Sequence, residues 1–273
     1  MLEEGKQVDD GAGPVTPTHH PILPVQCVSY LPKGPRRRNV RWAVSRKANI
    51  KRMKTLYVYT PMHNGRLSIV GGGPSVNETY KDIKGEVMVC GSMHDHAIRL
   101  GIKPDYVVEC DPHPDQKRFY TQTSDAKYFV ASRCDKATFD HLKGRDVYLW
   151  HMWEQDLGKP VYKGEPAINC GATVVLSAIP IAISLSYNEF QFYGIDSSFP
   201  DPEHHHAYDC PEEATKLVVR VGNPDTGREF HTTATWVGQA QQYQQMAQVW
   251  GFKARFHGDG MLAEMERQAG RQQ

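Results

Sequence analysis

The chain has 273 residues, of which 40% are hydrophobic and 23% are charged, and its formal net charge at pH 7 is +1. A domain of this length buries roughly 75% of its extended-chain surface, so the chain supports a substantial core. No apolar run approaches the roughly 18 residues of a membrane span, and the N-terminus lacks the basic-then-apolar order of a secretory signal. We therefore expect a soluble, cytoplasmic protein with no membrane partner, and the net charge argues neither for nor against a polyanionic partner.

The first part of the chain is expected to lie outside the folded domain. Residues 1–38 are rich in Gly, Pro, Thr and charged residues and are predicted to form an irregular tail. A strongly basic stretch follows at residues 32–54, PKGPRRRNVRWAVSRKANIKRMK. It is interpreted as a solvated lead-in, with contact to nucleic acid or a phosphorylated substrate as the alternative. We expect one domain over residues 39–265 and a C-terminal tail over residues 266–273.

From residue 67 onward, short apolar runs alternate with longer polar or helical segments. The runs are continuous rather than alternating in hydrophobicity, which is typical of strands covered on both faces and hence of a parallel sheet. They are LSIV (67–70), EVMVC (86–90), DYVVEC (105–110), KYFVAS (127–132), DVYLW (146–150) and EFQFYGID (189–196).

Helices are predicted between and after these runs, at residues 92–101, 172–187 and 233–251. Pro180 is expected to kink the second of these or to end its first half. The alternation predicts an α/β fold, a doubly wound and mostly parallel sheet with helices on both faces. Ligands of such sheets bind outside the carboxyl ends of the strands, so a binding site is expected at the turns that follow those ends.

The first run is followed directly by the sequence GGGPS. Glycines here allow backbone N–H groups to approach a phosphate closely, and the serine could cap the next helix or donate its hydroxyl. A tight strand-to-helix turn explains the glycines equally well. The turn is neither a Walker A loop nor the dinucleotide fingerprint, because no GK[ST] follows and a proline interrupts the pattern. The candidate phosphate-binding residues are Gly71, Gly72, Gly73, Pro74 and Ser75.

The third run is followed by ECDPHPD, residues 109–115, which places two carboxylates at the same edge of the sheet. Prolines flanking His113 stiffen this loop and so hold Asp111 and Asp115 in place. Carboxylates near a phosphate site bind Mg²⁺ or accept hydroxyl groups, so this pair is predicted to bind a metal. A loop of solvated acids and helix-capping aspartates is the alternative.

The sixth run ends at Asp196 and is followed by three consecutive histidines, residues 204–206. One histidine is expected to serve as a base or substrate ligand; a zinc site and plain surface polarity are the alternatives. Before the predicted helix containing Pro180, the sequence INCGAT offers Asn169, Gly171 and Thr173 at a second helix start suited to an anion or a ribose. Four such polar turns at one sheet edge favour a nucleotide site.

Together these segments resemble the MptE-like 6-hydroxymethylpterin diphosphokinase family, which includes a domain of flagellar motility accessory factors. The matching segments are IVGGGPSV, AIRLGIKPDYVVECDPHPDQ, NCGATVVLSAIPIAISLSYNEFQFYGIDSSF and HHHAYDC, across roughly residues 66–210. The resemblance implies a Rossmann-like domain similar to bacterial sialyltransferases, in which the Gly-Pro-Ser turn holds a nucleotide phosphate. The sequence departs from the family at CGSMHDH, where Ser92 stands near the position of an expected asparagine.

The resemblance leaves three functions open. The first is diphosphate transfer from ATP to a small hydroxymethyl acceptor with Mg²⁺, in which Asp111, Asp196 and His206 are catalytic and Asp111 and Asp115 bind the metal. The second is a glycosyltransferase that uses a nucleotide sugar, such as a CMP-nonulosonic acid, with a glycan acceptor and a histidine base. The third is a non-catalytic nucleotide-binding module. The nucleotide would contact the glycine turn, Ser92, Asn169 and Gly171.

Overall fold

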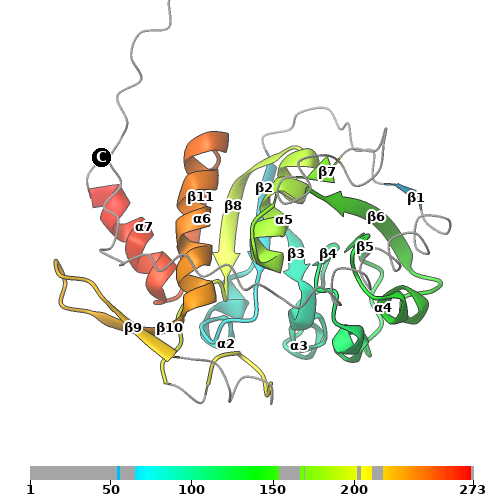
Figure 1. The fold of residues 1–273 in the computed structure, drawn as a ribbon, viewed down its shortest axis with the longest axis horizontal. Helices are drawn as coiled ribbons and strands as arrows, with labels where there is room; N and C mark the ends of the chain where they lie inside the picture. Colours follow the sequence, from blue (N-terminus) through cyan, green and yellow to red (C-terminus); the bar gives the residue numbers. More distant parts are fainter. Residues whose placement is uncertain are drawn as a thin grey trace, which may run out of the picture.

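The computed structural model describes residues 54–55, 65–153, 167–168, 170–201, 204–210 and 218–271, and these form a parallel sheet with helices packed around it (Figure 1). The strand order is β1-β6-β5-β4-β3-β2-β8-β11, with β7 paired to β6, and the strand pairs of this sheet are parallel. The strands are β1 (Lys54–Thr55), β2 (Gly65–Val70), β3 (Glu86–Cys90), β4 (Tyr106–Glu109), β5 (Lys127–Ala131), β6 (Asp146–Met152), β7 (Ala167–Ile168), β8 (Tyr187–Tyr193) and β11 (Lys253–His257). The predicted Rossmann-like α/β fold is confirmed.

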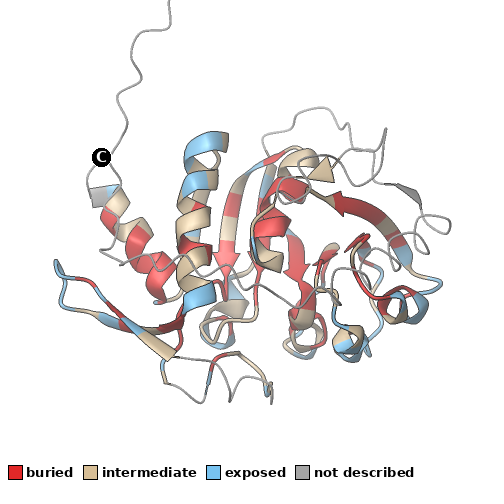
Figure 2. Cartoon of the chain, viewed as in Figure 1, coloured by how far each residue is buried: buried red, intermediate tan, exposed pale blue. Residues whose placement is uncertain are grey.

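Alternate residues of the central strands enter two separate hydrophobic clusters, so both faces of the sheet are covered (Figure 2). Leu67 and Ile69 of β2 pack in the larger cluster with α5 and α6, whereas Val70 packs in the smaller cluster with α2 and α3. The helices are α2 (Val76–Thr79), α3 (His94–Arg99), α4 (Lys136–His141), α5 (Val174–Ser184), α6 (Ala234–Trp250) and α7 (Met261–Arg271), with short 3₁₀ turns η1 (Tyr80–Asp82), η2 (Gly91–Met93) and η3 (Pro114–Phe119). None of these helices has the length and apolar character that crossing a bilayer requires.

Three features differ from the expectations. Helix α5 continues through Pro180, so the alternative that the proline ends the first half of the helix is wrong; the residues on both sides of the proline are buried in the core. Helix α7 runs past residue 265 to Arg271, and its Gln268 is buried, so the domain includes most of the expected C-terminal tail. Strands β9 (Val218–Gly222) and β10 (Glu229–Thr233) form an antiparallel hairpin that was not predicted. The expected N-terminal tail and the basic stretch up to residue 53 lie outside the described residues.

The order of the strands determines where a ligand crevice opens. From β2 the chain adds β3, β4, β5 and β6 on one side, and then places β8 on the other side of β2. This reversal is a topological switch point, where the turns after β2 and β8 diverge and leave a crevice at the carboxyl ends of the strands. The sequences that follow these two strands, GGGPS and GIDSS, therefore meet at the crevice.

Candidate functional site

The turns after β2 and β8 are in direct backbone contact. The N–H of Gly71 donates to the carbonyl of Tyr193 at 2.8 Å, and the N–H of Gly73 donates to the carbonyl of Gly194 at 2.8 Å. A Cβ atom on Gly71 would lie 2.6 Å from the oxygen of Gly194, and one on Gly73 would lie 2.5 Å from Oδ2 of Asp196. The contact between the turns thus requires glycine at both positions. The sequence left a tight turn open as the alternative to phosphate binding, and this contact supports the tight turn.

Asp196 joins the two turns through its carboxylate. Its Oδ2 accepts the N–H of Ser75 at 3.0 Å, and its Oδ1 accepts the hydroxyl of Ser75 at 2.5 Å. Burial raises the pKa of Asp196 to about 6, against the opposing effect of these two hydrogen bonds. The side chain therefore holds the turn that carries Pro74 and begins helix α2, and it also contributes to the wall of a cavity between the two turns.

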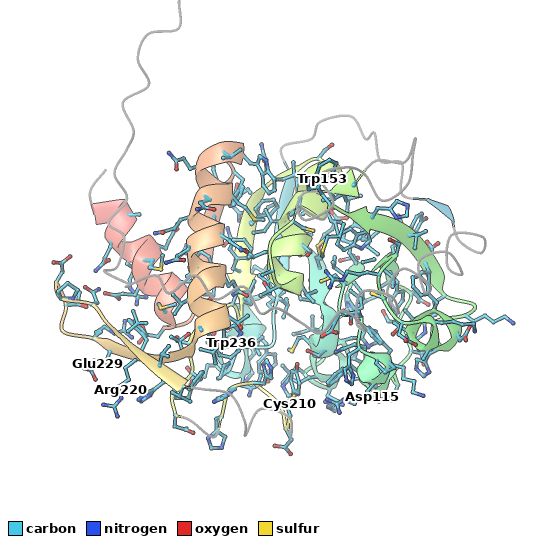
Figure 3. The ribbon with its side chains drawn as sticks, in the orientation of Figure 1. Asp115, Trp153, Cys210, Arg220, Glu229 and Trp236 are labelled. Carbon is cyan, nitrogen blue, oxygen red and sulfur yellow. The ribbon has the colours of Figure 1, made fainter. Side chains whose placement is uncertain are left out.

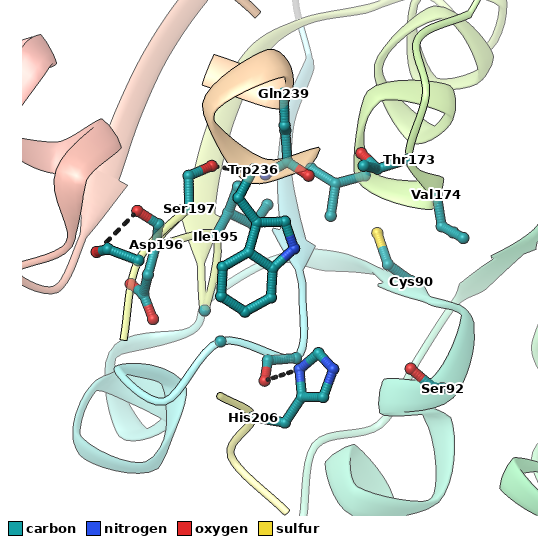
Figure 4. Close-up of a pocket in the computed structure, with 15 residues that line it drawn as sticks. Cys90, Ser92, Thr173, Val174, Ile195, Asp196, Ser197, His206, Trp236 and Gln239 are labelled. Atoms are coloured by element: carbon teal, nitrogen blue, oxygen red, sulfur yellow. Dashed lines mark hydrogen bonds between the residues drawn. The ribbon is translucent and has the colours of Figure 1, made fainter. Parts of the chain in front are cut away.

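A cavity of about 140 Å³ lies at this junction (Figure 4). Its walls come from the turn after β2, the end of β3, the start of α5, the turn after β8, the histidine loop and the first turns of α6. The lining residues are Gly72, Gly73, Cys90, Ser92, Thr173, Val174, Val175, Gly194, Ile195, Asp196, Ser197, Ser198, His206, Trp236 and Gln239. Of the predicted site residues, the structure thus brings together Gly72, Gly73, Ser92, Asp196 and His206.

The N-terminus of helix α5 opens onto the cavity. Thr173 is the N-cap residue, and its hydroxyl accepts the N–H of Leu176 at 3.3 Å. The N–H groups of Val174 and Val175 belong to the first turn, where no preceding turn supplies a carbonyl partner, and the helix dipole adds positive potential there. Such helix starts bind anions. The group suited to an anion is therefore the start of the helix, at the N-cap residue Thr173 that the sequence indicated and the two residues after it.

His206 faces the cavity from a loop that lies on the glycine turn. The N–H of Ala207 donates to the carbonyl of Gly72 at 2.9 Å, and Nδ1 of His206 lies 3.2 Å from the same oxygen. The imidazole stacks on Tyr208 with a centroid distance of 5.3 Å, and Trp236 lies 5.9 Å away. With Nδ1–H donating to Gly72, Nε2 is the ring nitrogen that carries the lone pair. This arrangement suits a general base, because Nε2 of His206 can accept a proton.

The predicted metal ligands do not assemble at the cavity. Asp111 and Asp115 are absent from the described lining, and Asp115 lies well away from Trp236 along the sheet edge (Figure 3). Their loop makes local hydrogen bonds, from the N–H of His113 to Oδ1 of Asp111 at 2.8 Å and from the N–H of Asp115 to Nδ1 of His113 at 3.3 Å. The described residues contain no group of three or more metal-binding side chains. Because one or two carboxylates can hold Mg²⁺ together with the phosphates of a substrate, the metal-binding role of Asp111 and Asp115 stays a prediction.

The other predicted nucleotide contacts have different outcomes, and Ser92 has a second role besides lining the cavity. Asn169 lies outside the described residues. Gly171 packs against Leu176 and Gln242 so closely that a Cβ atom would overlap both, which gives it a packing role. The hydroxyl of Ser92 lies 2.5 Å from that of Tyr208, so this residue ties the histidine loop to the turn after β3.

Sequence reasoning missed several residues at this edge. Glu109, the last residue of β4, accepts the N–H groups of Cys110 and Asp111 at 2.7 and 2.8 Å and the hydroxyl of Tyr120 at 2.6 Å. Burial raises its pKa to about 7. The sequence did contain an indication of this buried carboxylate, since Glu109 interrupts the otherwise apolar end of the run DYVVEC. Trp236 and Gln239 fall within the helix predicted at residues 233–251, and nothing in their spacing places them at the turns of the sheet.

Comparisons with known proteins agree with this architecture. A family model described as 6-hydroxymethylpterin diphosphokinase MptE-like matches residues 45–202. No curated protein matches the chain. Among solved structures, the MAf glycosyltransferase from Magnetospirillum magneticum AMB-1 is similar over 86% of this chain, with a TM-score of 0.61 and 14% identity, and the match spans 40% of that protein. The sialyltransferase CstII from Campylobacter jejuni, in complex with cytidine-5'-monophosphate, matches 75% of this chain and 85% of its own, with a TM-score of 0.44 and 15% identity.

Proposed function

The chain belongs to the MptE-like 6-hydroxymethylpterin diphosphokinase family, and we propose that it is a nucleotide-dependent transferase whose donor is a nucleotide-activated sugar. The family match agrees with the resemblance expected from the sequence. The observation that carries the choice of donor is the composition of the cavity wall. The wall combines a helix start, an imidazole and the carboxylate of Asp196, which is hydrogen-bonded to Ser75, whereas Asp111 and Asp115 lie outside it.

The charge of the wall favours a lightly charged donor. Among the described residues that line the cavity there is no Lys or Arg, and the positive potential comes from the N–H groups of Val174 and Val175. A triphosphate needs cations to neutralise the charge that develops on its transferred group. The phosphate of a nucleotide sugar such as a CMP-sugar carries less charge and fits a backbone cradle at a helix start.

His206 is positioned to act as the base. In the proposed step the oxygen of an acceptor hydroxyl forms a bond to the anomeric carbon of the sugar. The bond from that carbon to the phosphate oxygen breaks, and the nucleoside phosphate leaves with the electron pair. The hydroxyl proton passes to Nε2 of His206, whose Nδ1–H donates to the Gly72 carbonyl. This hydrogen bond sets the tautomer that leaves Nε2 basic.

The experiment is a release assay with CMP-N-acetylneuraminate and UDP-N-acetylglucosamine, each with a glycan acceptor, in the presence of EDTA. We expect release of the nucleoside phosphate from one of these donors, undiminished by the chelator. The MAf glycosyltransferase gives this activity a precedent on the same fold, although the likeness to it concerns the fold alone. Release that depends fully on added Mg²⁺ would contradict the metal-independent mechanism.

The family description favours diphosphate transfer from ATP as a second candidate. Its test is AMP release from ATP in the presence of 6-hydroxymethyl-7,8-dihydropterin, measured with and without Mg²⁺. Mg²⁺-dependent AMP release that is abolished by Asp111→Asn would establish this function and displace the first. If none of ATP, GTP, CMP and CTP raises the melting temperature, with or without Mg²⁺, both enzymatic functions are contradicted. The remaining function is then that of a non-catalytic domain.

A further inference from the structure

Ser197, in the cavity wall, has a backbone conformation that is unusual for a residue with a side chain. Its φ is +50°, in the left-handed region that costs a non-glycine residue roughly 1 kcal/mol or more. The segment is held in place by its neighbours: the hydroxyl of Thr232 donates to the Ser197 carbonyl at 2.6 Å, and the N–H of Met261 donates to the Ser198 hydroxyl at 2.9 Å. Strain that is maintained in this way at a cavity is typical of functional sites.

The side chain of Ser197 is oriented by Gln239 of helix α6. Nε2 of Gln239 donates to Oγ of Ser197 at 2.8 Å, and the exposed fractions of the two residues are 6% and 5%. The other amide atom of Gln239 faces the side of the cavity where Thr173 lies (Figure 4). Ser197 and Gln239 therefore present fixed, uncharged hydrogen-bonding groups to a ligand that enters the cavity.

Trp236, one turn before Gln239, supplies an apolar surface beside these polar groups. Its indole makes edge contacts with Phe199, His205 and His206, at interplanar angles of 67°, 67° and 61°. These contacts hold the ring in one orientation, and the indole lies in the middle of the cavity view (Figure 4). Indole rings suit ligands that have one apolar face and polar groups at their rim.

We propose that Trp236, Gln239 and Ser197 form a subsite that selects the monosaccharide ring of the donor, with Gln239 and Ser197 hydrogen-bonding its hydroxyl groups and Trp236 covering its C–H face. The inference rests on the proposed sugar donor. The cavity of about 140 Å³ has room for about five water-sized groups at roughly 30 Å³ each, so it can enclose part of one sugar ring but not a whole nucleotide. A site built to hydrogen-bond hydroxyl groups discriminates strongly, because a mismatched ring leaves buried polar groups unpaired.

The test measures how much affinity the sugar adds to the nucleotide. Calorimetric titrations give the ratio of the dissociation constants of UDP and UDP-N-acetylglucosamine, and of CMP and CMP-N-acetylneuraminate. The two pairs distinguish a neutral ring from a carboxylated one. In Gln239→Leu we expect this ratio to fall by about tenfold for the pair that binds, because one hydrogen bond is lost, while the affinity for the nucleotide alone is unchanged. Gln245→Leu, the same change at an exposed position of α6, should leave both affinities unaltered.

A second variant guards against misfolding. Ser197→Gly removes the hydroxyl that Gln239 binds but relieves the strain at a φ of +50°, so the two effects on stability oppose each other; it should weaken sugar binding with little change in the melting temperature. Equal weakening of nucleotide and nucleotide sugar in Gln239→Leu, or a sugar that adds no affinity to the wild type, would overturn the subsite and leave the proposed function standing. If no nucleotide binds but free N-acetylglucosamine or N-acetylneuraminate binds in a manner sensitive to Gln239→Leu, the subsite stands and the nucleotide-donor function fails.

Discussion

Ser75 and Asp196 are 121 positions apart in the chain and are joined by two hydrogen bonds, from the Ser75 N–H to Oδ2 at 3.0 Å and from the Ser75 hydroxyl to Oδ1 at 2.5 Å. One residue begins the helix after the glycine turn, and the other lies in the turn after β8. The pair makes the two sides of the crevice a single unit. It also keeps the carboxylate of Asp196 buried, and this burial affects the stability of the protein and the way that stability depends on pH.

Removing the hydroxyl of Ser75 should destabilise the protein. In Ser75→Ala the buried carboxylate loses one of its two partners, and a hydrogen bond to a charged group contributes about 1.5–3 kcal/mol. We expect the free energy of unfolding, measured by urea denaturation at pH 7.5, to fall by that amount. The matched control is Ser124→Ala, which removes a hydroxyl that accepts a local hydrogen bond from the N–H of Ala126. It should lower the free energy of unfolding by less. Equal losses in the two variants would contradict the assigned role.

Stability should fall as the pH rises from about 4 to 7, through two buried carboxyl groups. Burial raises the pKa of Asp196 from 3.8 to about 6 and that of Glu109 from 4.5 to about 7. Between the unfolded and folded pKa values the native state binds more protons than the unfolded state. Each group therefore contributes most to the free energy of unfolding below its unfolded pKa. This contribution, up to about 3 kcal/mol per group, is lost as the pH rises through the folded pKa.

The measurement compares wild type with Asp196→Asn and Glu109→Gln by urea denaturation between pH 4 and 8. Because other carboxylates titrate in the same range, the difference between variant and wild type is the informative quantity. We expect each variant to gain stability relative to wild type as the pH rises through its window. A difference that is constant across the pH range would show that the carboxyl groups ionise normally.

The glycine turn tolerates no side chain at Gly73. A Cβ atom there would lie 2.5 Å from Oδ2 of Asp196 and 2.8 Å from the carbonyl oxygen of Gly194. Gly73→Ala should therefore lower the free energy of unfolding by more than about 2 kcal/mol, because overpacking forces the two turns apart. Gly238→Ala is the control: this glycine lies within α6 with open space around it, and alanine there should stabilise by about 0.5–1 kcal/mol. A neutral Gly73→Ala would argue against a rigid contact between the turns.

The sheet could be predicted from sequence because its central strands are covered on both faces. Strands such as β3 and β5 appear as uninterrupted apolar runs, and glycine or polar residues follow them at the crevice. Strands at the periphery give weaker patterns. In β11, the sequence KARFH alternates exposed and half-buried residues, and the β9–β10 hairpin has its strongest indication in the turn sequence NPDTG.

The candidate site was predictable only in part, because sequence locates turns but not the segments packed across them. The glycine turn and His206 were found at the ends of predicted strands, and the structure places them together. Trp236 and Gln239 reach the cavity from a helix that begins after β10, and this placement depends on how α6 packs on the sheet. Asp111 and Asp115 were predicted from their residue type and their place after a strand, and neither residue lines the cavity.

Replacing His206 should remove catalysis while leaving the nucleotide bound. General-base catalysis contributes about 10²–10⁴-fold to a rate, so His206→Ala should lower the rate of nucleoside phosphate release by that factor. The dissociation constant of the nucleotide should change little, because the helix start at Val174 and Val175 is unaffected. Added imidazole should restore part of the activity by occupying the space left by the ring. His204→Ala is the matched control, since this histidine is 69% exposed and pairs with Asp201 at 2.8 Å. A rate that is unchanged in His206→Ala, or lowered equally in both variants, would exclude His206 as the base and return the choice of base to the carboxylates of this sheet edge.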